Sequence, residues 1–364
     1  RADARARAIS RVNFDGSLRD LVRRAASMAQ PVLIGVDAAI GYPGRAWAGL
    51  VGSRRPRPKT FIDFLFDGPR PPGFFAPVRR PEDWSPETPF ISPPAGSWSL
   101  NEYIAASGDA LYREIDRRLN GNPIFLMSGM PGTVGSGTCA LWQELIALQR
   151  TQRFRVWPFH GSMGTLLDAG SPVIAEIYPK ACYGIALAEA LPATPCTIAK
   201  TKPDERLGYV RELRDAPWVA RHMIAIEDWR AAEENEDDFD ALFSAAALLR
   251  IVIENAALER QWDLEKRIEG SVLGAASLKD SRPRRAGTSG APRAARKRDA
   301  PREGQRRQTY ECPIADCGYM FQDTRGGWDA HVASVHRHPH WHPDVHDPAA
   351  RKRLFRTEFP EWFR

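Results

Sequence analysis

The spacing of apolar and polar positions divides the first 275 residues into short elements. Apolar runs that read as buried strands occur at residues 31–37, 123–127, 154–158 and 173–178. Between the runs, apolar residues recur at helical spacing, which predicts helices at residues 18–30, 101–119, 139–150, 203–213 and 239–265. Strands that alternate with helices predict an α/β fold for this part of the chain.

Residues 41–100 interrupt the pattern because they carry many prolines and aromatic side chains. Repeated proline breaks helices, so we expect a long irregular insertion with a few short helices. No apolar run approaches the ~20 residues that cross a bilayer, which predicts a soluble protein with no membrane partner. The 364 residues suffice for one domain of usual size and a smaller unit.

The composition changes after residue 275. Residues 276–308 are rich in Arg, Ala, Pro, Gly and Ser and have almost no apolar bulk, so they should not pack. Ten Lys and Arg residues stand against two acidic residues between positions 282 and 307, which accounts for the chain's net charge of +6. We therefore expect a domain at 1–275, a basic disordered linker at 276–308 and a second module at 309–364. The linker either attracts phosphate backbones or serves only as a solvated tether.

The cysteines separate into two groups. Three of the five are scattered, while Cys312 and Cys317 form a close pair. This usage suits a reducing compartment better than a disulfide scaffold, and no apolar signal segment follows the basic N-terminus. We expect a cytoplasmic protein.

The C-terminal module carries the spacing of a zinc site. Cys312 and Cys317 are followed by His331 and His336 in the pattern Cys-x4-Cys-x13-His-x4-His. Two thiolates and two imidazoles match the tetrahedral ligand set of structural Zn²⁺, and metal binding would supply the folding free energy of so small a unit. The module resembles a Cys2His2 zinc finger. His338 is an alternative fourth ligand.

The same module offers little for reading a base sequence. The stretch that would enter the major groove contains two glycines, and Arg325 is its one good partner for guanine. A single finger of this kind favours non-specific docking of nucleic acid, or contact with a protein partner, over sequence-specific recognition.

Four carboxylates stand out in the larger domain. Asp37 ends an apolar run, Glu176 lies inside another, and Asp237 and Asp240 share one face near the start of the long helix. A carboxylate in an apolar strand is costly unless a cation or a donor compensates it. Converging carboxylates suit Mg²⁺ or Mn²⁺, and two such ions about 4 Å apart support phosphodiester cleavage. Spacing alone also allows plain structural roles, such as a helix cap or a turn.

An ordered set of segments resembles the domain of unknown function 429, the family of predicted RNase H-like nucleases. The segments are Val36–Pro43, Glu176–Lys180, Asp237–Leu242 and Glu269–Gly270, and the resemblance covers roughly residues 30–275. It implies a mixed central sheet with helices on both faces, with the four carboxylates at the catalytic centre. It also implies that Lys200, Lys202 and Arg206 contact phosphate. The chain departs from the family at Ala39, where proline is common.

Three functions remain open on these residues. The first is a metal-dependent nuclease of DNA or RNA, in which Asp37, Glu176 and Asp240 hold Mg²⁺ or Mn²⁺ and Asp237 assists. The second is a non-catalytic adaptor that binds nucleic acid or protein through an inactive RNase H-like domain and the zinc module. The third, a phosphotransferase, lacks convincing phosphate loops.

Overall fold

The computed structural model forms two compact units, Arg1–Arg285 (unit 1) and Ala286–Arg364 (unit 2). The residues that it describes are 2–10, 17–52, 57–92, 100–108, 110–127, 133–227, 229–257, 266–279, 309–311, 314, 320–322, 341–342, 344–345 and 348–359. Within these residues, no helix is long and apolar enough to span a bilayer.

A short parallel sheet forms the centre of unit 1. Its strands are β3 (Leu33–Val36), β5 (Val173–Glu176) and β4 (Arg155–Val156), in the order β3-β5-β4. They coincide with three of the four predicted runs, and parallel strands joined through helices confirm the α/β class.

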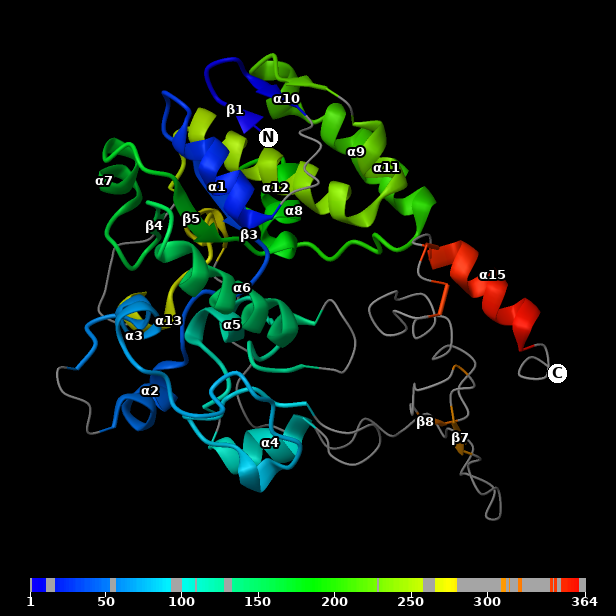
Figure 1. Ribbon diagram of the computed structural model, residues 1–364. Coiled ribbons are helices and arrows are strands. Elements are labelled where there is room, and N and C mark those ends of the chain that lie inside the picture. The colour runs from blue at the N-terminus through cyan, green and yellow to red at the C-terminus, as the bar shows by residue number, and fades with distance from the viewer. Residues whose placement is uncertain are drawn as a thin grey trace, which may run out of the picture. The chain divides into compact units, whose positions relative to one another are not determined.

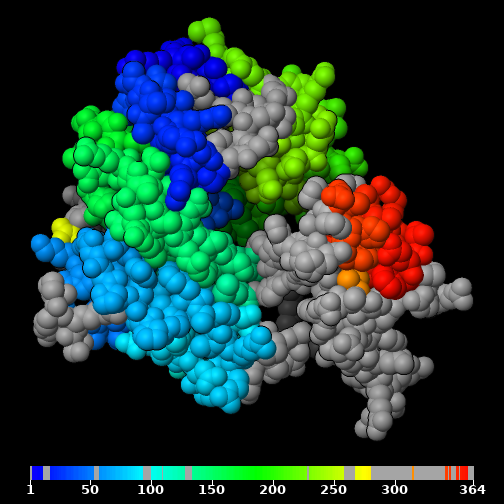
Figure 2. Space-filling view, viewed as in Figure 1, coloured from blue at the N-terminus to red at the C-terminus, as the bar shows by residue number. Residues whose placement is uncertain are grey.

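The expected mixed sheet differs from the central sheet in the described residues, where all three strands are parallel. Antiparallel pairing in the described part of unit 1 involves β1 (Ala2–Asp3) and β2 (Ala8–Ile9), and β2 then pairs in parallel with β6 (Ala225–Ile226). Figure 2 shows the N-terminal segment in blue beside the yellow-green segment that carries β6.

Helices cover both faces of the central sheet, as Figure 1 shows. Side chains of β5 alternate between the two faces, because Val173 and Ala175 belong to one buried cluster and Ile174 to the other. The first cluster includes side chains of α7 (Met163–Asp168), α8 (Pro179–Leu187), α9 (Pro203–Arg214), α10 (Pro217–Arg221), α11 (Arg230–Glu234) and α12 (Glu236–Ile253). The second includes side chains of α1 (Leu18–Ala26), α2 (Gly44–Val51), α3 (Phe61–Asp67), α4 (Leu100–Ser107) and α6 (Val134–Gln149).

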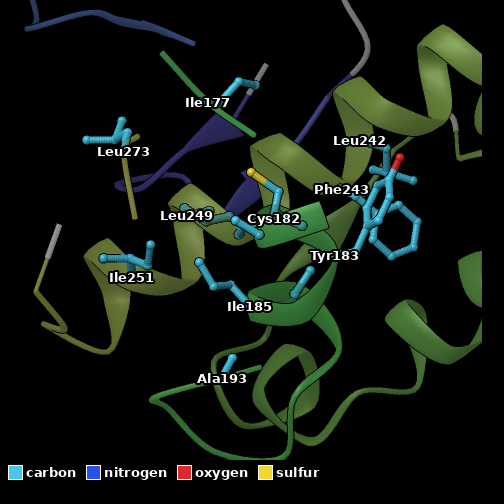
Figure 3. Close-up of a cluster of buried hydrophobic side chains, with 14 of the residues drawn as sticks. Ile177, Cys182, Tyr183, Ile185, Ala193, Leu242, Phe243, Leu249, Ile251 and Leu273 are labelled. Atoms are coloured by element: carbon cyan, nitrogen blue, oxygen red, sulfur yellow. The ribbon is translucent and has the colours of Figure 1, made fainter. Parts of the chain in front are cut away.

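The first cluster sets α8 against α12. Figure 3 shows Cys182 and Ile185 of α8 facing Leu249 and Phe243 of α12. The ring of Tyr183 makes edge contacts with Phe239 and Phe243, at centroid distances of 5.7 Å. This packing fixes the start of α12, and the two carboxylates on it, relative to α8.

The observed helix α12 begins three residues before the predicted helix at 239–265 and also ends before it. Asn235 caps α12, since its side-chain oxygen accepts the backbone N–H groups of Asp237 and Asp238. The helix ends at Ile253, and residues 258–265 lie outside the described part. Similarly, the helix predicted from Cys139 begins at Val134, so Gly135 and Gly137 belong to α6.

Two other expectations need correction. The predicted helix at 101–119 is two helices, α4 and α5 (Glu114–Arg118), separated near Gly108, which has a φ of +58°. The predicted strand at 123–127 is a turn in which only Leu126 bridges to Ile91. The start of α6 packs on this segment, because the backbone N–H of Gly135 donates to the carbonyl of Leu126 at 3.0 Å.

The insertion at 41–100 contains α2, α3 and the 3-10 turn η1 (Pro81–Asp83) among its described residues, as expected. Its aromatic side chains gather around the fully buried Trp142 of α6. The distance between ring centroids is 4.6 Å from Phe61 to that indole, 5.6 Å from Phe90 and 6.0 Å from Phe74. The insertion is therefore part of the second core rather than a loose excursion.

Unit 2 contains an antiparallel hairpin, β7 (Thr309–Glu311) with β8 (Met320–Gln322), and the helix α15 (Pro348–Glu358). The tail aromatics pack on one another, with Phe355 6.0 Å from Trp341 and 5.0 Å from Phe359. The buried Arg351 donates to the carbonyls of His342 and Val345. The smaller helix α13 (Lys266–Glu269) and the 3-10 turn η2 (Ala275–Ser277) belong to unit 1.

Candidate carboxylate site

The predicted carboxylates of the sheet lie at the carboxyl ends of adjacent strands. Asp37 directly follows β3 and Glu176 is the last residue of β5, where Val36 is its partner in register. The carboxyl edge of a parallel sheet is the usual place for ligands in α/β proteins. The two residues therefore occupy one edge, although they are 139 positions apart.

Asp37 is one of two accessible members of the group. It is exposed, and no hydrogen bond or ion pair joins it to any residue in the described part of the chain. Its pKa rises from 3.8 to about 6, mainly because surrounding protein reduces hydration of the carboxylate, and next because of Asp240. Glu176 and Asp237 add to this shift and Lys200 opposes it. The predicted carboxylates therefore share one electrostatic neighbourhood.

Asp240 is held by two donors from different elements. One of its oxygens accepts the hydroxyl of Tyr183 in α8, and the other accepts the ammonium of Lys200, which precedes α9. Burial raises the pKa of Tyr183, and its bond to the Asp240 carboxylate adds to that shift. Lys200 thus lies beside Asp240 as the nearest cation, in agreement with its predicted place at the site.

Asp237 lies one turn before Asp240 on α12. The residue is exposed, and its side chain makes no hydrogen bond or ion pair within the described residues. Asp237 is thus an accessible carboxylate near the start of a long helix.

Glu176 is in a different state, because a buried arginine occupies both of its oxygens. Nη2 of Arg113 donates to Oε1 at 2.6 Å, and Nη1 donates to Oε2 at 2.7 Å. Oε2 also accepts the backbone N–H of Ile40 at 2.8 Å. Burial raises the pKa of Glu176, and Arg113 opposes that shift. Glu176 is therefore paired with a buried guanidinium, whereas Asp240 is held by a hydroxyl and a partly exposed ammonium, and Asp37 and Asp237 have no such partner within the described residues.

Arg113 was missed by the sequence analysis. Its side chain is 1% exposed, and it also binds Asp116, with Nη2 2.7 Å from Oδ1. Burial lowers the pKa of Arg113, but the two carboxylates outweigh burial and keep it well above its ordinary value. The one local signal is an acidic residue three positions later, which resembles an ordinary exposed pair at a helix start.

Glu269 ties two helix starts together. Oε1 accepts the backbone N–H of Gly44 at the start of α2, at 2.7 Å, and Oε2 accepts that of Glu114 at the start of α5, at 2.6 Å. Carboxylates at helix N-termini complement the unpaired N–H groups there. Glu269 belongs to the last of the four segments that carry the resemblance, and its partner Gly44 directly follows the first of them.

The predicted phosphate-binding residues fall into different settings. Arg206 is 5% exposed and donates to the carbonyls of Lys200, Glu233 and Glu234, so its guanidinium braces the backbone. Lys202 is exposed, and its ammonium lies 3.9 Å from Glu205. We therefore keep Lys200 and Lys202 in the candidate set and assign Arg206 to the scaffold.

The predicted zinc ligands Cys312, Cys317, His331 and His336 lie outside the described residues, as does Arg325. Within the described part of the chain, no three Cys, His, Asp or Glu side chains gather closely enough to hold a metal. The four predicted carboxylates of unit 1 influence one another electrostatically, but among the described residues no three of them lie close enough together to coordinate one metal ion.

A pH effect on stability should follow from the raised pKa of Asp37. A carboxyl group with a raised folded-state pKa binds extra protons when folded, so its favourable contribution is lost as pH rises from about 4 to about 6. Asp37→Asn removes this loss. The melting temperature of the variant relative to wild type should therefore increase between pH 4 and 7 and then level off, in scans without added metal.

Asp215→Asn serves as the control for that series, because Asp215 is an exposed carboxylate at the end of α9. An Asp37→Asn difference that stays constant over the same pH range would contradict the repulsive neighbourhood described for Asp37.

Comparisons of the chain with protein-family models, curated proteins and solved structures give no match.

Proposed function

We propose that unit 1 is a divalent-metal-dependent phosphodiesterase that cleaves DNA or RNA, built on an RNase H-like domain. The observation that carries the proposal is Asp37, an exposed carboxylate with no partner among the described residues, whose pKa is raised mainly by reduced hydration and further by Asp240, Glu176 and Asp237. Such mutual repulsion is relieved when a cation binds, and perturbed groups of this kind cluster at functional sites.

The donor set suits a hard cation in a restricted form. Mg²⁺ and Mn²⁺ prefer carboxylate oxygens, and Mg²⁺ commonly uses one or two protein carboxylates together with phosphate oxygens of the substrate. Asp37 with Asp240 or Asp237 meets that requirement. Glu176 does not, because both of its oxygens are paired with a buried guanidinium, whereas the ammonium on Asp240 comes from the partly exposed Lys200. A bound cation would supply charge stabilisation and a more acidic water at this edge of the sheet.

The remaining residues have roles that do not depend on the cation. Tyr183 and Lys200 orient Asp240 and fix its place beside Asp37. Lys200 also provides a positive charge at the site, which favours binding of a phosphate group. Lys202 is exposed and can add a second positive charge for binding the phosphate backbone of a polymer.

The test is cleavage of end-labelled single- and double-stranded DNA and RNA by the full chain with Mg²⁺ or Mn²⁺. Cleavage that requires the added metal and is stopped by a chelator supports the proposal and identifies the preferred polymer. Binding of every substrate without cleavage would move the assignment to a second candidate, a nucleic-acid or protein adaptor. The capture of Glu176 by Arg113 is the observation that favours this alternative.

For unit 2, we propose a structural zinc site with ligands Cys312, Cys317, His331 and His336. What supports it is the ligand spacing, together with the β7–β8 hairpin, whose strands flank both cysteines in the sequence. With the basic segment before it, this module would dock nucleic acid or a protein partner near unit 1.

Zinc content gives a direct prediction. The purified chain should carry about one zinc ion, and Cys317→Ser should lose it, because three remaining ligands hold structural zinc poorly. Metal analysis by mass spectrometry measures both. Cys196→Ser, a thiol in unit 1, is the control and should keep its zinc. Comparing His336→Ala with His338→Ala then identifies the fourth ligand, and equal zinc content in all variants would exclude the site.

A further inference from the structure

The backbone immediately after Asp37 is held by side chains from three distant elements. The indole N–H of Trp142 donates to the carbonyl of Ala39 at 2.9 Å. The N–H of Ile40 donates to Glu176, and its carbonyl accepts Nη1 of Arg113 at 3.4 Å. The N–H and the carbonyl of Ile40, three positions after Asp37, are therefore both bound by the Arg113–Glu176 pair.

The same loop packs directly on the backbone of a second segment. A Cβ atom on Gly41 would lie 2.0 Å from the carbonyl oxygen of Glu269, and one on Gly270 would lie 2.0 Å from that of Ile40. Nη1 of Arg113 reaches this junction as well, 3.2 Å from the Glu269 carbonyl. The guanidinium thus links the two backbone segments where no side chain fits between them.

The charges of Arg113 and its two carboxylate partners stabilise this link between the two backbone segments. Arg113 is the central cation between Glu176, which is 5% exposed, and Asp116, which is 8% exposed. If Glu176 were to coordinate a metal ion, the cation would compete with the buried guanidinium for the same carboxylate and place a second positive charge beside it. Separating a buried charge from its partner is strongly unfavourable.

We infer that Arg113 is a positioning residue for Asp37. Glu176 then serves as the counter-charge of Arg113 rather than as a metal ligand. The second part rests on the proposed function, in which Asp37 binds the cation. The first part concerns the loop at residues 38–44 and holds whether or not metal binds.

Hydrogen exchange of the full chain tests the loop. Arg113→Lys keeps the charge but cannot reproduce the guanidinium fork, and Glu176→Gln keeps one acceptor for Arg113. Both variants should lose about tenfold or more of the amide protection in peptides covering residues 38–44. Protection of α12 should stay unchanged.

The matched control is Arg250→Lys. Arg250 is also 1% exposed and donates to the carbonyl of Ile185 and to Glu254, away from the loop. It should leave exchange at residues 38–44 unaltered. Unchanged protection of the loop in both test variants, or an equal loss in the control, would overturn the positioning role.

Manganese titration, read from the paramagnetic resonance signal of free Mn²⁺, tests the assignment of Glu176. Glu176→Gln should bind Mn²⁺ within about threefold of wild type, whereas Asp37→Asn should bind about tenfold or more weakly. A loss in Glu176→Gln as large as in Asp37→Asn, and larger than in Arg113→Lys, which disturbs the same loop without removing a carboxylate, would make Glu176 a ligand and overturn that assignment. If wild type binds no Mn²⁺, the proposed function fails, and Glu176 is then no metal ligand either, while hydrogen exchange still decides the role of Arg113.

Discussion

Asp37→Asn is expected to reduce metal-dependent cleavage by about 10²- to 10³-fold, while the chain remains folded. Asparagine has nearly the same shape as aspartate but lacks the charge that attracts a divalent cation. Because Asp37 has no partner within the described residues, its loss should break no structural contact. The measurement is single-turnover cleavage of the preferred labelled polymer at saturating Mn²⁺.

One control and one comparison variant make this result interpretable. Asp215→Asn removes an exposed carboxylate outside the group that acts on Asp37 and should cleave as wild type does. Asp237→Asn tests the neighbouring exposed carboxylate on α12. If Asp37→Asn cleaves at the wild-type rate, the observed nuclease activity has another source and the proposed site is wrong.

Arg113→Met should destabilise unit 1 by about 3–5 kcal/mol, which is the usual result of stranding a buried ionic partner. Methionine fills much of the volume but leaves Glu176 and Asp116 without their cation. It also removes the donors to the carbonyls of Ile40 and Glu269. Urea unfolding followed by tryptophan fluorescence measures the loss, since Trp142 lies beside the loop.

The double variant Arg113→Met with Glu176→Gln should be more stable than Arg113→Met alone, because it removes one stranded carboxylate. Arg211→Met, an exposed arginine on α9, should change stability by less than about 0.5 kcal/mol. A loss at Arg113 no larger than the loss at Arg211 would show that the buried network contributes little to folding.

The sequence predicted those elements whose residues are chosen by local rules. The strands at 33–36 and 173–176 are short apolar runs, and α9 begins at Pro203 and has regular helical spacing. Their positions at one sheet edge explain why Asp37 and Glu176 were correctly expected to be neighbours. The run at 123–127 misled because a buried turn and a buried strand have the same apolar character.

Partner choice within the site could not be predicted, since it depends on tertiary contacts. Nothing near Arg113 in the sequence indicates that it reaches Glu176, 63 positions away. Likewise, the binding of Asp240 by Tyr183 and Lys200 joins three separate elements. Sequence spacing identifies which carboxylates can meet, whereas packing decides which of them are already neutralised.

Glu269 has a consequence for the order in which unit 1 is assembled. Its carboxylate closes the starts of α2 and α5, and its partner Gly44 lies 225 positions earlier in the chain. During synthesis, residues 38–44 therefore leave the ribosome long before the segment that locks them, and contacts of such large sequence separation form slowly. We therefore expect the contacts of Glu269 to form late in folding, and a chain truncated before residue 269 would lack the carboxylate that binds the starts of α2 and α5.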